Sequence, residues 1–173
     1  FGDDEKERQN FLEDALDGAQ YLQTLIDDLL FLNLLDQGKV DTFRQNIRLK
    51  YNFHEPIAQC LQRWEDKNLE VRVKVEPDVE IYAPRIRFEQ AITHLMDNAC
   101  KFSPEGGRIA VHLAPNGRGG CVLTVADKGP GIPVQLRERV FERYYQISQG
   151  EGRLYGGLGV GLTIARAVAR ALG

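Results

Sequence analysis

Residues 121–131 decide the fold: Cys121-Val122-Leu123-Thr124-Val125-Ala126-Asp127-Lys128-Gly129-Pro130-Gly131, an apolar strand followed by an aspartate and two closely spaced glycines. We expect the strand to hold Asp127 buried or half-buried at its end. There its carboxylate can accept a hydrogen bond from an exocyclic amine such as that of adenine. Gly129 and Gly131 let the backbone pass close to a flat ring. Taken alone, the motif is a weak signal and more typical of an ordinary turn.

A second glycine motif lies downstream, Gly156-Gly157-Leu158-Gly159-Val160-Gly161-Leu162, and opens a predicted helix. Glycines before a helix let backbone N–H groups point at phosphate oxygens, and the helix dipole favours the negative charge. No Gly-Lys-Ser/Thr follows and no strand directly precedes, which excludes a P-loop and a Rossmann fingerprint. The alternative interpretation is a flexible linker.

A third motif lies at the end of the helix predicted to start near Pro84. It reads His94-Leu95-Met96-Asp97-Asn98-Ala99-Cys100-Lys101-Phe102. Asn98 and Lys101 are three residues apart and project from about the same face. An amide oxygen suits Mg²⁺, and a lysine can balance phosphate charge. A solvated helix face is the alternative, so the hypothesis depends on the combination of acceptor, metal ligand and phosphate loop in one chain.

Apolar residues recur at helical spacing over residues 5–36 and predict a long helix. Its heptad seam consists of Leu12, Ala15, Ala19, Leu22, Ile26, Leu29 and Asn33. The apolar stripe is wider than in a two-stranded coiled coil, which favours a bundle completed by another segment or chain. An amphipathic helix docked on its own domain is the alternative. Gly38 predicts the helix stop, so we expect one domain over 1–39 and another over 40–173.

Periodicity predicts the remaining elements of the second domain. They are a helix over 55–67, a strand over 69–75, a helix over 84–102, a hairpin of strands 108–113 and 121–126, a short amphipathic piece around 140–141 and a last helix from 161. This order predicts an α+β fold: a two-layer α/β sandwich whose mixed sheet is covered by helices on one face, preceded by the long helix.

The composition indicates a protein with no general affinity for polyanions. The 173 residues carry 22 basic and 25 acidic side chains, a net charge of −3, so we expect no nucleic-acid partner and no direct membrane contact. Three distant cysteines, Cys60, Cys100 and Cys121, predict reduced thiols and no structural zinc. No apolar run reaches the roughly 20 residues of a membrane span, and residues 1–8 are too charged for a signal peptide. We expect a cytoplasmic piece of a longer protein, which can itself be soluble or membrane-anchored.

Together the motifs resemble the nucleotide-binding boxes of the Bergerat ATP-binding fold, which histidine kinases, Hsp90, type II topoisomerases and MutL share. The sensor histidine kinases fit best. Residues 98–107 resemble their N box, 127–133 their first glycine box, 140–145 their F box and 157–162 their second glycine box. Residues 25–30 and 37–39 are similar to the second helix of the family's dimerisation and histidine-phosphotransfer domain.

The resemblance implies a role for each matching residue. Asn98 would coordinate Mg²⁺, Asp127 would bind the adenine amino group, and Lys101 and Arg143 would pair with the triphosphate. Gly129 and Gly131 would shape the base pocket. The remaining implied ATP-site residues are Phe102, Ile132, Tyr145, Gly157, Leu158, Gly159, Val160, Gly161 and Leu162. Phe141 would anchor a mobile lid lying between Ile132 and Gly156.

The implied activity is transfer of the ATP γ-phosphate to a histidine outside this chain, for relay to a response regulator receiver domain. The implied assembly is a homodimer through the N-terminal helix. No catalytic side chain is assigned, because phosphoryl transfer rests mainly on positioning and electrostatics. His54 follows the arm, where the family has no acceptor, and His112 on a strand is interpreted as structural.

In three places the sequence departs from the pattern of the sensor histidine kinases, and these departures leave other functions open. His94 replaces an asparagine of the N box and Gln146 replaces a frequent arginine, which leaves a degenerate, regulatory kinase-like module as an alternative. Other Bergerat ATPases usually carry a glutamate general base, whereas this helix offers Asp97 beside Asn98. The family normally continues past the position of Gly173 through further strands, so we expect that C-terminal strands are missing.

Overall fold

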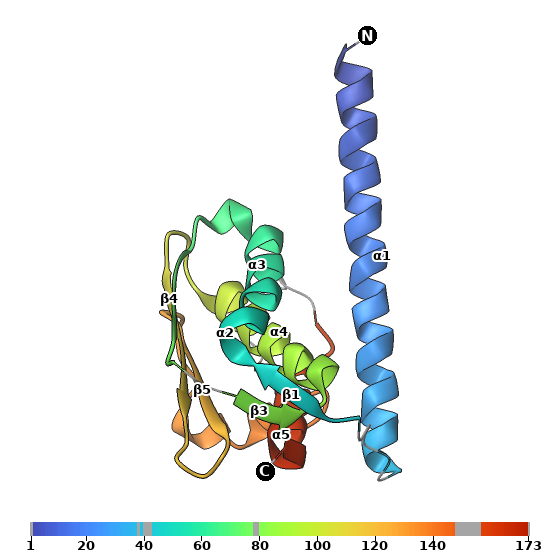
Figure 1. Ribbon diagram of the computed structural model, residues 1–173. Coiled ribbons are helices and arrows are strands. Elements are labelled where there is room, and N and C mark those ends of the chain that lie inside the picture. The colour runs from blue at the N-terminus through green and yellow to red at the C-terminus, as the bar shows by residue number, and fades with distance from the viewer. Residues whose placement is uncertain (1, 38, 40–42, 78–79, 148–156, 173) are drawn as a thin grey trace. The chain divides into compact units, whose positions relative to one another are not determined.

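The computed structural model describes residues 2–37, 39, 43–77, 80–147 and 157–172. The chain divides into two compact units, residues 1–40 and 41–173 (Figure 1). No helix within the described residues is long and apolar enough to cross a bilayer.

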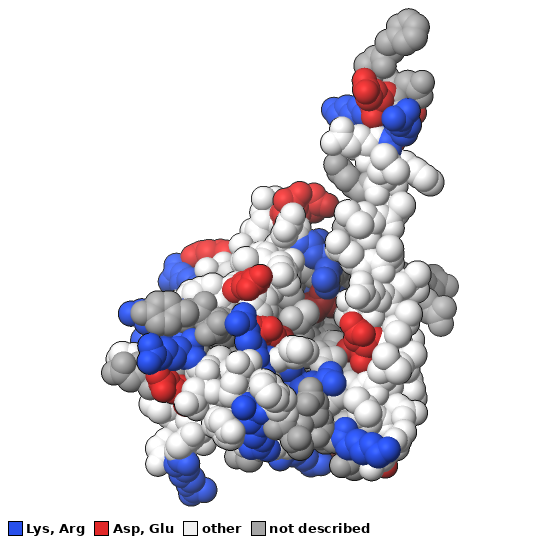
Figure 2. All heavy atoms as spheres, turned by 45° about the vertical axis from the view of Figure 1, so that its right-hand side comes forward, with Lys and Arg blue, Asp and Glu red and all other residues white. Residues whose placement is uncertain are grey.

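The first unit is a single helix, α1 (Gly2–Asp36), which confirms the helix predicted over 5–36. The amide of Lys39 donates to the carbonyl of Leu34 at 2.9 Å beyond its last turn; the stop predicted at Gly38 lies outside the described residues. Its exposed large apolar side chains are Phe11, Leu12, Leu16, Leu22, Ile26, Leu29 and Leu30. Figure 2 shows Lys or Arg side chains beside Asp or Glu side chains near the N-terminal end of α1. One helix cannot cover such a stripe by itself.

The second unit is built on a three-stranded sheet in the order β2 (Glu70–Val75), β4 (Arg108–Pro115), β5 (Cys121–Ala126). Strands β2 and β4 run parallel, with Glu70 opposite Arg108. Strands β4 and β5 form an antiparallel hairpin, with Ala110 opposite Ala126. The predicted mixed sheet and hairpin are therefore confirmed.

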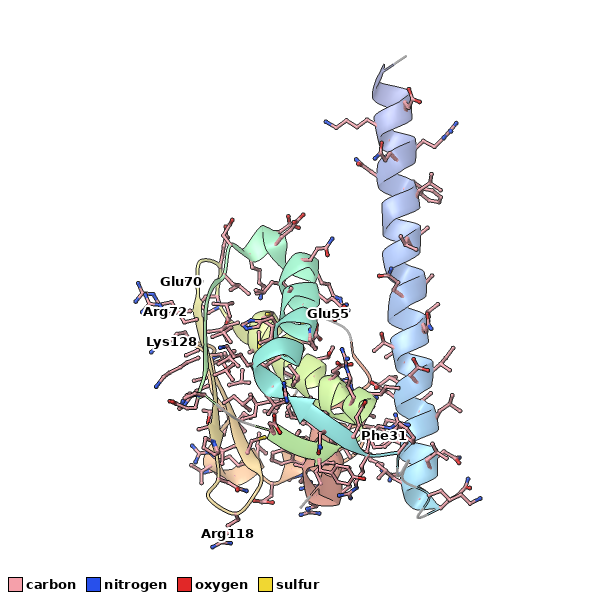
Figure 3. All side chains as sticks on the ribbon, in the orientation of Figure 1. Phe31, Glu55, Glu70, Arg72, Arg118 and Lys128 are labelled. Carbon is pink, nitrogen blue, oxygen red and sulfur yellow. The ribbon has the colours of Figure 1, made fainter. Side chains whose placement is uncertain are left out.

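Three helices lie on one face of this sheet: α3 (His54–Arg63), α4 (Arg85–Phe102) and α5 (Gly161–Leu172) (Figure 1). Helix α4 packs against both α3 and α5. Ile92 and Met96 of α4 share one buried cluster with Val111 and Leu113 of β4. The opposite face of the sheet is charged, and Figure 3 shows Arg72 there, pointing away from the helices. The predicted α/β sandwich with helices on one face is confirmed.

A second, two-stranded sheet was not predicted. In it β1 (Gln45–Arg48) pairs antiparallel with β3 (Glu80–Ala83), and Ile47 lies opposite Ile81. Each strand has four residues, which is too short for a clear alternating pattern. A one-turn helix, α2 (Leu49–Asn52), follows β1 and was also missed.

Two helix boundaries differ from the prediction. The helix predicted over 55–67 ends at Arg63, because Trp64 leaves the helical region at φ −114° and ψ 25°. A short 3₁₀ turn, η1 (Glu65–Lys67), then leads to Asn68 in the left-handed conformation at φ 49°. Pro84 caps α4 in an extended conformation and does not sit in its first turn. Two further 3₁₀ turns, η2 (Val134–Leu136) and η3 (Arg139–Phe141), precede α5, and η3 is the short piece predicted around 140–141, with Val140 buried.

Substitutions at two isoleucines of α4 test which face of this helix is buried in the core. Ile92 is 0% exposed and Ile86 is 70% exposed. Ile92→Ala should lower the free energy of unfolding by about 2–5 kcal/mol, because it removes apolar contacts and leaves a cavity. Ile86→Ala should change it by less than about 0.5 kcal/mol. Urea unfolding followed by the fluorescence of Trp64 measures both, and equal effects would contradict the assigned face of α4.

Candidate functional site

The aspartate of the first glycine motif lies immediately after β5, where the strand ends. Asp127 is exposed, so the prediction of a buried or half-buried carboxylate is wrong. Among the described strands β5 is at the edge of the sheet, and Ala126 before it is exposed as well. The carboxylate is nevertheless oriented, because Oδ1 accepts a hydrogen bond from the amide of Gly129 at 2.7 Å.

Gly129 brings this loop onto the C-terminal end of α4. A Cβ at position 129 would lie 2.8 Å from the carbonyl oxygen of Phe102, closer than a real Cβ atom approaches a backbone oxygen. Gly131 has φ +72°, a conformation that glycine adopts at little cost. The motif is therefore a close backbone approach between two elements and not a simple turn, and it places Asp127 near the end of the helix that carries Asn98.

The second glycine motif is held by the segment that follows η3. Gly159 has φ +70°, and a Cβ there would lie 2.9 Å from the carbonyl oxygen of Tyr145. The carbonyl of Gly159 accepts a hydrogen bond from the amide of Tyr144 at 3.0 Å. The side-chain amide of Gln146 donates to the carbonyl of Gly157. These contacts fix the motif at the start of α5 and contradict the flexible-linker interpretation.

Helix α4 contributes a lysine to the same region. A Cβ on Gly157 would lie 3.5 Å from Nζ of Lys101. Burial lowers the pKa of Lys101 below its usual range, and the Asp97 carboxylate, one turn earlier, opposes that shift. The ammonium group is thus partly desolvated beside the glycine motif, where an anion would interact with it strongly.

Two further polar residues of α4, Asn98 and His94, differ in the contacts of their side chains. Asn98 is half-buried, and its side chain makes no hydrogen bond with any residue that the structure describes. His94, one turn earlier, packs on α5: a Cβ on Gly161 would lie 3.0 Å from Nδ1 of the imidazole. The glycine at the first position of α5 therefore leaves room for the histidine ring.

Phe141 of η3 is tied to α5 by residues that sequence reasoning missed. Its carbonyl accepts hydrogen bonds from Oγ1 of Thr163 at 2.9 Å and from Nη2 of Arg166 at 3.0 Å. The guanidinium of Arg166 also stacks over the Phe141 ring, 4.9 Å from its centre. Thr163 and Arg166, polar residues three apart on a largely apolar helix, were the available signal. These bonds support the expectation that Phe141 is an anchor.

The predicted site residues divide into those that the structure joins by close approach and those it does not. The joined pairs are Phe102 with Gly129, Lys101 with Gly157 and Tyr145 with Gly159. Of the other predicted site residues, Asn98, Leu158 and Leu162 are half-buried, Ile132 and Arg143 are exposed, and Val160 is buried. Residues 148–156, the C-terminal part of the predicted lid together with Gly156, lie outside the described residues.

The residues present fit a nucleotide better than a metal ion alone. Amides at the start of α5, an uncluttered glycine backbone and Lys101 suit phosphate oxygens. No group of three or more His, Cys, Asp or Glu side chains that could hold a metal occurs in the described part of the chain. A Mg²⁺ ion would thus share the amide oxygen of Asn98 with phosphate and water oxygens, as this ion commonly does.

The cysteines offer no nucleophile to this site. Burial raises the pKa of Cys60 to about 12 and that of Cys100 to about 11. Burial also raises the pKa of Cys121. All three are free thiols, and the expectation of reduced cysteines is confirmed for the structure described. A thiol with such a pKa is protonated at neutral pH and unreactive.

The comparison with protein families decides the identity of the fold. A family model described as "Histidine kinase-, DNA gyrase B-, and HSP90-like ATPase" matches residues 83–173, more than half of the chain. The chain belongs to this ATPase family. The match covers the segment from the end of β3 through α5, which contains every site residue named above, and the resemblance inferred from the motifs is confirmed.

Among curated proteins, the chain is similar to "Signal transduction histidine-protein kinase/phosphatase MprB" of Mycobacterium bovis (strain BCG / Pasteur 1173P2), with 35% identity over 162 residues. It is also similar to "Adaptive-response sensory kinase SasA" of Trichormus variabilis, with 29% identity over 163 residues. These alignments cover 90% and 94% of this chain but 29% and 40% of the relatives. The chain thus spans well under half the length of these relatives.

Solved structures agree with this assignment. A mycobacterial sensor histidine kinase MprB matches with a TM-score of 0.65 and 30% identity, covering 75% of this chain and 80% of that one. Full-length ShkA, solved in complex with AMPPNP, matches with a TM-score of 0.76 over 95% of this chain and 34% of that one. At 23% identity, the second likeness shows the fold alone.

Two glycines with similar backbone angles test the close approach at the second glycine motif. Gly159 and Gly119 both have positive φ, but only Gly159 has atoms within 4 Å of an added Cβ. Gly119→Ala should cost about 1–2 kcal/mol of unfolding free energy from backbone strain. Gly159→Ala should cost about 1–3 kcal/mol more through overpacking. It should also accelerate hydrogen exchange at the amide of Tyr144, and slow exchange there in Gly159→Ala would contradict the assigned contact.

Proposed function

We propose that this chain is the ATP-binding catalytic part of a sensor histidine kinase, which transfers the γ-phosphate of Mg²⁺-ATP to a histidine outside the chain. One observation carries the proposal. The loop after β5, the end of α4 and the glycines before α5 meet through the approaches of Gly129 to Phe102 and of Gly157 to Lys101. These three segments supply an acceptor for a base, an oxygen ligand for a metal and amides for phosphates.

Each segment has a distinct role in this proposal. The carboxylate of Asp127 accepts a hydrogen bond from the adenine amino group, and Gly129 and Gly131 let the ring approach the backbone. The amides of residues 157–161 and the ammonium of Lys101 bind phosphate oxygens. Arg143, exposed after η3, pairs with the triphosphate in this proposal. The names of the relatives support a kinase over the other ATPases of the family.

The reaction needs position and charge more than a side-chain nucleophile. An imidazole nitrogen attacks the γ-phosphorus with its lone pair, a phosphorus–nitrogen bond forms, and the bond to the β–γ bridging oxygen breaks. ADP departs with that electron pair. Mg²⁺, when bound, neutralises charge on the phosphate oxygens. This chain's part is to hold the phosphates in line and to exclude competing water.

The helical unit fits the same proposal. The apolar side chains along α1, from Phe11 to Leu30, remain exposed, and we infer that residues 1–39 belong to a dimerisation and phosphotransfer bundle. In this proposal α1 pairs with a second copy of the protein, and the phosphorylated histidine passes its phosphate to a response regulator receiver domain.

Asp127→Asn tests the adenine contact. An amide can present its NH₂ group to the adenine amine and loses the charged acceptor, so ATP affinity should fall by about tenfold or more. The matched control is Asp66→Asn on η1. Calorimetric titration with a non-hydrolysable ATP analogue and Mg²⁺ measures both. Unchanged affinity in Asp127→Asn would refute this role, and no binding by the unaltered chain would favour a regulatory module without catalysis.

Asn98→Ala tests the metal ligand. Analogue affinity in the presence of Mg²⁺ should fall to about the value measured without the ion, because the protein's oxygen ligand is gone. Affinity without Mg²⁺ should change by less than about twofold, since the contacts to base and phosphates remain. Asn46→Ala on β1 is the control. A full Mg²⁺ enhancement retained in Asn98→Ala would exclude Asn98 as the ligand.

A further inference from the structure

The C-terminal end of α4 is closed by a lysine from another element. The carbonyl of Ala99 accepts the amide of Ser103 at 3.1 Å. The carbonyls of Cys100, Lys101 and Ser103 all accept hydrogen bonds from Nζ of Lys67, at 3.0, 2.6 and 2.9 Å. The remaining carbonyl of the last turn, that of Phe102, lies against Gly129. One ammonium group thus satisfies carbonyls that a helix end normally leaves without a partner.

Lys67 is itself fixed in place. Its amide donates to the carbonyl of Trp64 at 3.1 Å, and its carbonyl accepts the amide of Gly106 at 2.8 Å. Its ammonium lies over the Trp64 indole, 5.1 Å from the ring centre. A cation at this place is also favoured by the negative end of the helix dipole.

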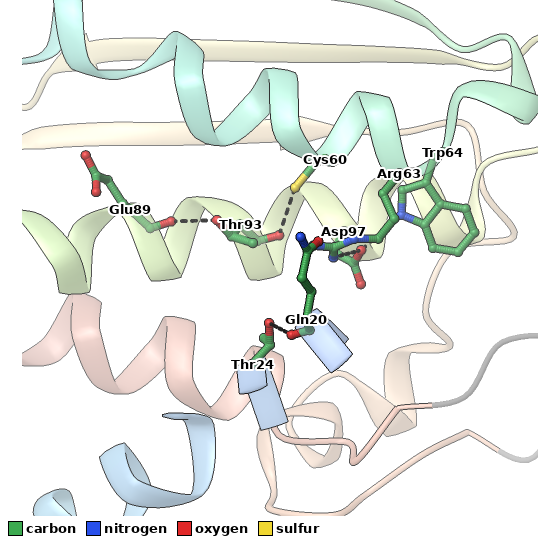
Figure 4. A network of polar contacts seen from close by, with 8 residues as sticks. All are labelled: Gln20, Thr24, Cys60, Arg63, Trp64, Glu89, Thr93 and Asp97. Carbon is green, nitrogen blue, oxygen red and sulfur yellow. Dashed lines mark hydrogen bonds and ion pairs between the residues drawn. The ribbon is translucent and has the colours of Figure 1, made fainter. Parts of the chain in front are cut away.

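Two residues just before Lys67, Arg63 and Trp64, contact α4 one turn earlier. Nε1 of Trp64 and Nη1 of Arg63 both donate to Oδ1 of Asp97, at 3.0 and 3.3 Å (Figure 4). We call Arg63, Trp64 and Lys67 the α4 clamp. The clamp holds the backbone and the Asp97 side chain on either side of Asn98. It therefore acts on the two turns of α4 that carry both Asn98 and Lys101.

We propose that Lys67 is a positioning residue for the nucleotide site, which acts by fixing the last turn of α4. The proposal rests on the proposed function, since it assigns a consequence for ATP binding to a residue outside the glycine motifs. Loss of the ammonium leaves three carbonyls without their donor and frees the last turn to fray. Lys101 then loses its place beside Gly157, and the Phe102 carbonyl shifts against Gly129, which displaces the loop that carries Asp127.

A purely structural role for Lys67 makes a different prediction from a positioning role. A structural role lowers the unfolding free energy and leaves the affinity of the folded protein unchanged. A positioning role lowers affinity even where the variant is fully folded. Leu113→Ala, in the core of β4, is the control for stability loss, and Lys74→Met is the control for loss of a lysine, because Lys74 is an exposed residue of β2 paired with Glu76.

The test uses the whole chain and calorimetric titration with a non-hydrolysable ATP analogue and Mg²⁺, at a temperature where far-UV circular dichroism shows every variant to be folded. Lys67→Met should bind about tenfold more weakly, as is typical when a supporting interaction behind a ligand is removed. Lys67→Arg, which keeps the charge, should recover most of that loss. Lys74→Met and Leu113→Ala should bind like the unaltered chain.

Hydrogen exchange provides the second readout. In Lys67→Met the amides of residues 101–103 should exchange faster, whereas those within α5 should not. If Lys67→Met fails to fold, Trp64→Phe replaces it: this change removes the donor to Asp97 but keeps a ring beneath Lys67, and it should weaken binding by about threefold.

The outcomes separate the two proposals. Unchanged affinity in the folded Lys67→Met variant, or in Trp64→Phe where that variant replaces it, overturns the positioning role and leaves the proposed function standing. Equal weakening in Leu113→Ala overturns it as well, because the effect would then follow stability. Absence of analogue binding by the unaltered chain overturns the proposed function, and the positioning role with it.

Discussion

The structure depends on how α4 is held by the sheet, by its neighbouring helices and by Lys67. Ile92 and Met96 bury its apolar face in the core shared with β4, α3 and α5 pack along it, and Lys67 closes its end. Every segment of the candidate site either belongs to this helix or contacts it. It supplies Asn98 and Lys101 directly, and the loop after β5 and the glycines before α5 are placed by contact with it.

Glycine performs two separate tasks in this site. At positions 131 and 159 the backbone has positive φ, so the residue is needed for conformation. At positions 129 and 161 the need is for space, since an added Cβ would meet the Phe102 carbonyl in one case and the His94 ring in the other. The motif spacing in the sequence therefore reflects tertiary contacts as well as local turns.

The elements that the sequence predicted correctly have a clear residue periodicity or a local motif. The apolar alternation of β2 and the helical spacing of α4 are long enough to be unambiguous, and the order of the motifs indicated the family. The four-residue strands β1 and β3 carry no such signal, because their pairing is set by partners about 35 residues away. The exposure of Asp127 and the interruption of α3 at Trp64 were missed for a related reason. Both depend on neighbours in space: Asp127 follows an edge strand, and Trp64 turns out of the helix to reach Asp97.

The charges that can bind an anion at the site come from nearby side chains and not from the net charge of the protein. With a net charge of −3 the protein has no general attraction for polyanions, so an anion must be bound by groups within a few ångströms. Burial beside the glycine motif lowers the pKa of Lys101, because burial penalises the charged ammonium form. A phosphate placed there would raise that pKa again, because an opposite charge favours the charged form. The desolvation of Lys101 therefore opposes folding but strengthens phosphate binding, provided that α4 holds the ammonium in place.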